Sequence, residues 1–251
     1  MATAVGTRRR FLLAFVALGA VLGGAIGAFV LLVERPAPPP PPLWSIWRPN
    51  ASALSDRARE IATHVGQEYR LPSGHRLVQV VVGVPGTTQL PIRAIALSAI
   101  PQPKSANDFR IYDPRKSVMY VLCGAGSKCA IAEGKPSVQR GAVLRREALE
   151  LALYTFRYLG GRDSVVVFFP PRKGQKLSFV LFFQRQDLSS ELKHPLRKTL
   201  PTNKPILPLP GTISAAERER VDGLTGSRVF RFELDKARSG GSILVLAPPA
   251  S

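Results

Sequence analysis

The pattern of hydrophobic and polar positions divides the chain into an apolar run, a proline-rich stretch and a longer region of short apolar segments. Phe11 to Val33 is an unbroken run of 23 uncharged, mostly apolar residues. As a helix it would rise roughly 35 Å at about 1.5 Å per residue, which is enough to cross a bilayer core. We therefore expect one transmembrane anchor over residues 11–33, preceded by a basic tail over residues 1–10.

The charges beside this run predict its orientation. Arg8, Arg9 and Arg10 precede it, whereas only Glu34 and Arg35 follow at once. A basic excess favours the cytoplasmic side, so we expect a single-pass cell-membrane protein with a cytoplasmic N-terminus and the bulk of the chain extracytoplasmic. The alternative is a cleaved signal peptide, whose apolar region usually has about 7 to 15 residues, fewer than here.

Two finer patterns lie in the same region. Residues 7–12, Thr-Arg-Arg-Arg-Phe-Leu, resemble the twin-arginine export signal, although a basic flank that only orients the helix explains them equally. Gly19, Gly23 and Gly27 fall at steps of four, which favours close helix packing and a homo-oligomer through the anchor. The alternative is that glycine is simply common in membrane helices.

Residues 34–42 are rich in proline and predict an extended linker. Trp44 and Trp47 follow directly. They suit either the membrane interface or packing against the following domain, and the length of the linker favours packing.

Residues 43–251 predict one α+β domain with an antiparallel or mixed sheet covered by helices. Helical spacing of apolar residues predicts helices from Ser52 or Ser55 to about Tyr69, over 145–159 and, kinked at Pro195, over 188–200. The near-continuous apolar character of 165–169 and 177–183 predicts strands that are covered on both faces. The segments rich in β-branched and aromatic residues are 77–84, 92–97, 109–112, 118–123, 129–132, 165–169, 177–183, 229–234 and 243–246.

The chain is strongly basic. Its net charge is +18, and the part after the apolar run has 32 Lys and Arg against 17 Asp and Glu, or +15. Such a surface attracts anionic partners such as lipid headgroups, wall polymers or an acidic protein. We expect no nucleic acid partner, because the domain is predicted to lie outside the cell and has no motif that reads bases.

Cys123 and Cys129 are the two cysteines of the chain, and they flank a short segment between two predicted strands. In an exported domain this arrangement predicts a structural disulfide. Free thiols, a redox pair or a metal site are the alternatives. The five intervening residues do not make a CxxC motif, and no further Cys or His ligands are close in sequence.

Other reactive chemistry is sparse. The three histidines lack metal-ligand spacing, no nucleophile elbow is present, and Glu147, Glu150 and Glu217 fall on predicted helix faces as solvated residues would. We expect no catalytic, cofactor-binding or metal-binding residues. Basic residues gather in one loop and in the segment that follows it, and they would form one patch if the hairpin end and the helix come together; the alternative is that they are simply solvated charges. These residues are Arg172, Lys173, Lys176, Lys193, Arg197 and Lys198.

These observations predict a membrane-anchored extracytoplasmic protein that binds or assembles a component of the cell envelope, and they favour a non-catalytic role. The alternatives are an envelope-modifying enzyme whose site has no familiar motif, or an electrostatic binder of anionic envelope polymers.

Overall fold

The computed structural model describes residues 4–33, 43–83, 91–202, 205–237 and 240–250. The chain forms two compact units, Met1–Pro42 and Leu43–Ser251. The predicted proline-rich linker, residues 34–42, lies outside the described residues.

The first unit contains one helix, α1 (Ala4–Val33), which begins well before Phe11 and so includes Arg8, Arg9 and Arg10. A membrane-crossing helix needs about 20 consecutive, mainly apolar residues. Among the described residues, no helix is both long and apolar enough to cross a membrane. The predicted fold class included one N-terminal transmembrane helix, and this finding contradicts that part of the prediction.

The three glycines of the predicted packing face lie in α1. A Cβ atom built on Gly19, Gly23 or Gly27 would meet no atom within 4 Å, so within this chain they make no close contact. Pairing of two copies through these glycines stays a prediction.

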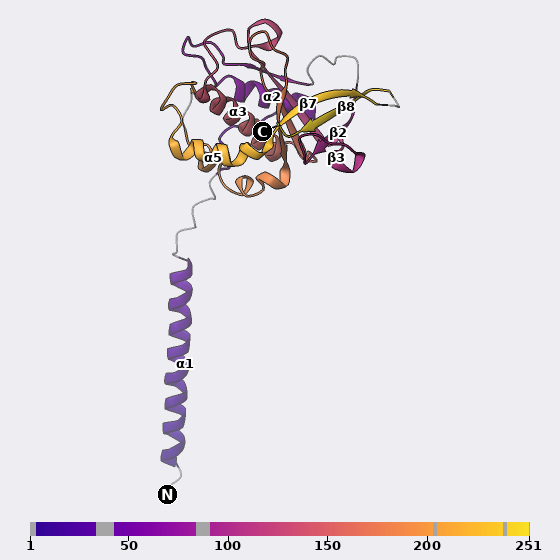
Figure 1. Ribbon diagram of the computed structural model, residues 1–251. Helices are drawn as coiled ribbons and strands as arrows, with labels where there is room; N and C mark the ends of the chain where they lie inside the picture. The colour runs from indigo at the N-terminus through magenta and orange to yellow at the C-terminus, as the bar shows by residue number, and fades with distance from the viewer. Residues whose placement is uncertain (1–3, 34–42, 84–90, 203–204, 238–239, 251) are drawn as a thin grey trace. The chain divides into compact units, whose positions relative to one another are not determined.

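The second unit is α+β, as predicted, and is built on one mixed sheet of eight strands (Figure 1). The strand order is β1-β4-β5-β6-β7-β8-β2-β3, in which β4–β5 and β8–β2 pair in parallel and the other neighbours pair antiparallel. The strands are β1 (Gln79–Val82), β2 (Ile92–Ser98), β3 (Phe109–Tyr112), β4 (Ser117–Cys123), β5 (Ser164–Phe168), β6 (Phe179–Gln184), β7 (Val229–Lys236) and β8 (Ser242–Ala247).

Helices cover one face of the central strands. They are α2 (Leu54–Gly66), α3 (Val138–Tyr158), α4 (Leu196–Thr199) and α5 (Ala215–Thr225). Leu149 and Leu153 of α3 are fully buried in the same core as Val165, Val167 and other strand residues. Burial of this continuous apolar face is the main favourable contribution to folding.

The opposite face is covered by the far half of the same sheet. Val166 and Phe182 of the central strands share a second core with Ile95 of β2 and Leu244 of β8. The rings of Tyr112 in β3 and Phe182 in β6 lie 5.1 Å apart, although three strands, β7, β8 and β2, separate β3 from β6 along the strand order. The sheet must therefore curl over itself, which gives three layers: helices, central strands, and the β7–β8–β2–β3 half.

The long strand β7 makes this fold possible. Its first residues pair with β6, Val229 with Leu181, while its later residues pair with β8, Lys236 with Ser242. One strand thus belongs to both halves of the sheet. In Figure 1, β7, β8, β2 and β3 lie on the other side of the unit from α3 and α5.

The structure confirms that the predicted strands 165–169 and 177–183 are covered on both faces over most of their length, since all five residues of β5 and Val180 to Phe183 of β6 are buried. Leu177 and Ser178 precede β6, and Phe179 is 43% exposed. The structure also confirms that the two tryptophans pack against the domain. Trp44 is only 8% exposed within the main core, and Trp47 stacks on His64 with ring centroids 3.9 Å apart.

Three predicted elements differ. Residues 129–132 are not a strand, because Cys129 has a φ of 66°, which a β-strand does not allow. Helix α3 begins at Val138 rather than 145, because Ser137 caps it by accepting a hydrogen bond from the Arg140 amide. The helix predicted over 188–200 is reduced to short 3₁₀ turns and α4, and Pro195 directly precedes α4.

Candidate anion-binding site

A cavity of about 720 Å³ opens in the second unit between the first turns of α3, the loop that joins β5 to β6, and the start of β7. Nineteen described residues line it, and five of them are Lys or Arg while none is Asp or Glu. The lining residues are Ile131, Ala132, Gly134, Pro136, Ser137, Arg140, Gly141, Leu144, Arg145, Phe169, Pro170, Pro171, Arg172, Lys173, Gln175, Lys176, Ser178, Phe179 and Val229.

Two of the cations come from the first turns of α3. Arg145 is compensated, because its Nη2 lies 2.6 Å from Oδ1 of Asp222 on α5. Arg140 donates from Nη2 to the backbone carbonyl of Glu133 at 2.7 Å, and its buried Nε has no hydrogen-bond partner among the described atoms. Burial lowers the pKa of Arg140 below its usual value, so an anion in the cavity would favour its charged form.

The position of Arg140 depends on Gly134. Gly134 has a φ of +68°, and a Cβ atom there would lie 2.6 Å from Nη2 of Arg140. A side chain at this position would therefore both strain the backbone and displace the guanidinium.

The other three cations, Arg172, Lys173 and Lys176, are exposed residues of the β5–β6 loop. The loop is anchored where the two strands end, because the Phe169 amide donates to the Phe179 carbonyl at 3.0 Å. The hairpin therefore brings these three charges to the same cavity as the positively polarised N-terminus of α3.

The cavity also has an apolar part. Leu144, Phe169 and Val229 are half-buried and pack against the main core, while Phe179 is 43% exposed. The site thus combines a cationic rim with an apolar floor.

A disulfide joins Cys123 and Cys129, as the sequence predicts. It closes a tight loop in which the Gly124 amide donates to the Cys129 carbonyl at 2.9 Å. A Cβ atom on Gly124 would lie only 2.3 Å from the backbone oxygen of Ala130. The close approach of these two backbone segments therefore requires glycine at position 124. The disulfide therefore fixes the start of the segment that continues into the cavity wall at Ile131.

Replacing both cysteines with serine is expected to destabilise the unit without unfolding it. The loop they close is short, so the loss should be about 2–3 kcal/mol. That corresponds to a melting temperature lower by roughly 4–12 °C for a domain of this size, measured by circular dichroism. Binding properties that do not involve the loop should persist. Alkylation that labels two free thiols in the native protein would contradict the bond.

The six predicted basic residues separate into two groups. Arg172, Lys173 and Lys176 line the cavity, whereas the other three are not among its lining residues. Lys193, Arg197 and Lys198 belong to the 3₁₀ turn Glu191–Lys193 and to α4. Arg140 and Arg145 were not predicted as site residues, and Arg140 lies before residue 145, where the helix that carries both was expected to begin. The signal that could have placed Arg140 on this helix is the capping residue Ser137.

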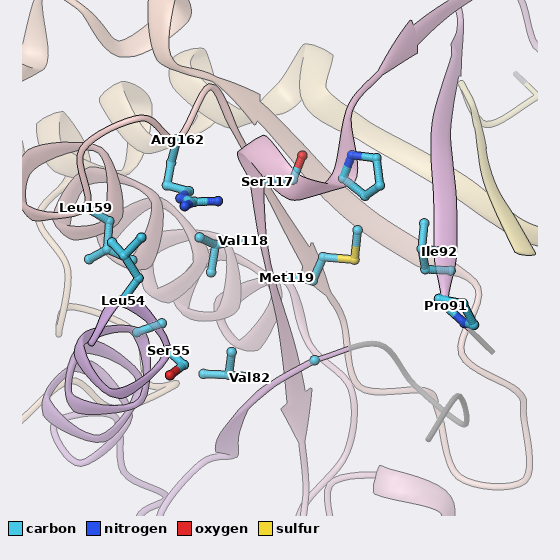
Figure 2. A pocket seen from close by; sticks show the side chains of 13 residues that line it. Leu54, Ser55, Val82, Pro91, Ile92, Ser117, Val118, Met119, Leu159 and Arg162 are labelled. Atoms are coloured by element: carbon cyan, nitrogen blue, oxygen red, sulfur yellow. The ribbon is translucent and has the colours of Figure 1, made fainter. Parts of the chain in front are cut away.

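A second cavity of about 420 Å³ lies between the start of α2, the end of β1, the start of β4 and the start of β2 (Figure 2). Figure 2 shows mainly aliphatic side chains around it, with Arg162 as the one charged side chain that it labels. Arg162 donates to the carbonyl of Arg115, and the hydroxyls of Ser117 and Ser164 lie 2.6 Å apart. Arg162, Ser117 and Ser164 are therefore engaged within the chain, and this second cavity offers less to a ligand than the cationic cavity.

A buried cluster of charges lies under α3. Arg146 is 1% exposed and donates from Nε to Glu217 at 2.7 Å and from Nη1 to the Tyr69 hydroxyl at 2.6 Å. Burial raises the pKa of Tyr69 well above its usual range, so the hydroxyl stays protonated and donates to Glu150 at 2.7 Å. The prediction that Glu147, Glu150 and Glu217 lie on solvated faces is wrong, because each is at most 2% exposed. The cluster is closed to solvent and serves the fold.

Among the described residues, no group of three or more His, Cys, Asp and Glu side chains could hold a metal ion. Comparisons of the chain with family models, with curated proteins and with solved structures find no match.

Proposed function

We propose that this protein is an exported, non-catalytic binding protein of the cell envelope, and that the cavity at the start of α3 holds the anionic group of its ligand. The observation that carries the proposal is the charge of the lining: five cationic side chains and no acidic one among the described residues. In a partly enclosed site these charges are screened less than on an open surface, so they favour an anion strongly.

The disulfide supports the extracytoplasmic location in this proposal. Cys123 and Cys129 are bonded, and structural disulfides persist in oxidising compartments outside the cytoplasm. The net charge of +18 supports an anionic partner in the envelope.

The polar groups of the cavity support binding rather than catalysis. The described lining residues include no carboxylate, imidazole or thiol that could act as a general base or nucleophile. Of the two serines, Ser137 caps α3, and the Ser178 hydroxyl donates to the Lys176 carbonyl at 3.0 Å. What the site offers a ligand is positive charge and hydrogen-bond donors.

The test removes the three loop charges. Fluorescently labelled short-chain polyphosphate should bind the full chain, and the triple variant Arg172→Ser, Lys173→Ser, Lys176→Ser should bind it at least about tenfold more weakly in fluorescence anisotropy. Each hydrogen bond to a charged group contributes about 1.5–3 kcal/mol, and about 1.4 kcal/mol is a factor of ten.

The chain offers a matched control. The triple variant Lys193→Ser, Arg197→Ser, Lys198→Ser removes the same charge from the group outside the cavity. It should change the affinity by less than about threefold, because distant exposed charges are screened. Equal losses in both variants would mean that binding follows net charge over the whole surface, and the proposed site would be wrong.

A further inference from the structure

The cationic cavity has a second chemical part that an anion alone does not use. Its exposed rim carries Arg172, Lys173 and Lys176, whereas Leu144, Phe169 and Val229 are half-buried within it. A small anion on the rim would leave the apolar part in contact with water, which is unfavourable. The lining therefore matches a ligand that has both a charged and an apolar end.

The two parts are arranged in order along α3. Arg140 and Leu144 are four residues apart, so they lie one turn from each other on the same face of the helix. The hairpin repeats this order, since Phe169 and Phe179 pair where the strands end and the loop cations lie beyond them. On both walls, cationic and apolar lining residues therefore lie next to one another.

We infer that the ligand is an amphiphile with a phosphate-bearing head group and one acyl chain, bound as a single molecule with its chain against Leu144, Phe169, Phe179 and Val229. Several Arg and Lys side chains and the first turns of a helix line the same cavity, and such donors suit the multiple charges and acceptor oxygens of a phosphate. A volume of about 720 Å³ lies in the range of sites that enclose small ligands. This inference rests on the proposed function of the same cavity.

The experiment compares two probes with the same head group in isothermal titration calorimetry of the full chain. Dodecanoyl lysophosphatidic acid, kept below its critical micelle concentration, carries the chain, and glycerol 3-phosphate does not. The acylated probe should bind at least about tenfold more tightly than glycerol 3-phosphate. The variant Phe179→Ser should reduce this ratio to below about threefold.

Phe179 is a safe position to change, because its side chain is 43% exposed. Val81→Ser is the matched control, since Val81 is 44% exposed and does not line the cavity, and it should leave the ratio at its original value. If the acyl chain bound α1 or another surface instead, the tighter binding would survive Phe179→Ser, and the inference would be overturned.

The remaining outcomes separate this inference from the proposed function. If both probes bind equally and the triple loop variant weakens both, the cavity is an anion site without an acyl-chain subsite, and only the inference fails. If neither probe binds and polyphosphate binding is also unaffected by the triple loop variant, the proposed function fails as well.

Discussion

Replacing Arg146 with methionine should destabilise the second unit by about 3–5 kcal/mol, the cost that is typical of breaking a buried ion pair from one side. The guanidinium is 1% exposed, and Glu217 and Glu150, at 2.7 and 3.3 Å, are similarly buried. Removing it would leave their carboxylates enclosed without the compensating cation. Urea denaturation followed by circular dichroism at neutral pH measures the loss.

Two variants make this result specific. Arg145→Met removes the neighbouring, partly exposed charge with its ion pair to Asp222, and should cost less than about 1 kcal/mol. The double variant Arg146→Met, Glu217→Met should be less destabilised than the sum of its single variants, because it removes both partners of the pair. A cost below about 1 kcal/mol for Arg146→Met would show that the cluster does not hold the helices together.

Replacing Phe182 with alanine should cost about 3–5 kcal/mol, because the side chain is 2% exposed and a cavity would remain. Phe182 belongs to the second core, where its ring meets Tyr112 at 5.1 Å and Phe230 at 6.4 Å. The same denaturation experiment measures the loss.

The pair Phe182 and Tyr112 also tests the curled sheet. If β3 lies over β6, the variants Phe182→Ala and Tyr112→Ala should be coupled by about 0.5–1.5 kcal/mol in a double-mutant cycle, as expected for an edge-to-face aromatic pair. Strictly additive effects would place β3 away from β6 and would contradict the three-layer arrangement.

Much of the secondary structure could be predicted from local patterns, and the three layers could not. The apolar runs of β5 and β6 correctly indicated strands with two covered faces. Nothing in such a run says what covers each face, and here it is helices on one side and the β8–β2 part of the same sheet on the other. The contact between the central strands and the β8–β2 part joins residues that are far apart in the sequence. Local hydrophobic periodicity does not predict such contacts.

Local sequence patterns also identified only part of the candidate site. The loop cations were visible as a cluster in sequence, but Lys193 and Arg197 were grouped with them only because they are near in the chain. Arg140 joins the site across space, through a helix that starts earlier than its apolar spacing suggested. The acidic residues of α3 were misjudged for a related reason, since charge alone does not reveal a buried partner such as Arg146.

The place of β8 in the sheet has a consequence for how the protein matures. β8 lies between β7 and β2, and Ser242 pairs in parallel with Ile92, 150 residues earlier. Until residues 242–247 have left the ribosome, the β2–β3 hairpin has no neighbouring strand, and the second core is incomplete. Contacts of this range form slowly. The nascent chain should therefore stay incompletely folded until residues 242–247 have emerged, and before that point its unpaired strands expose it to aggregation.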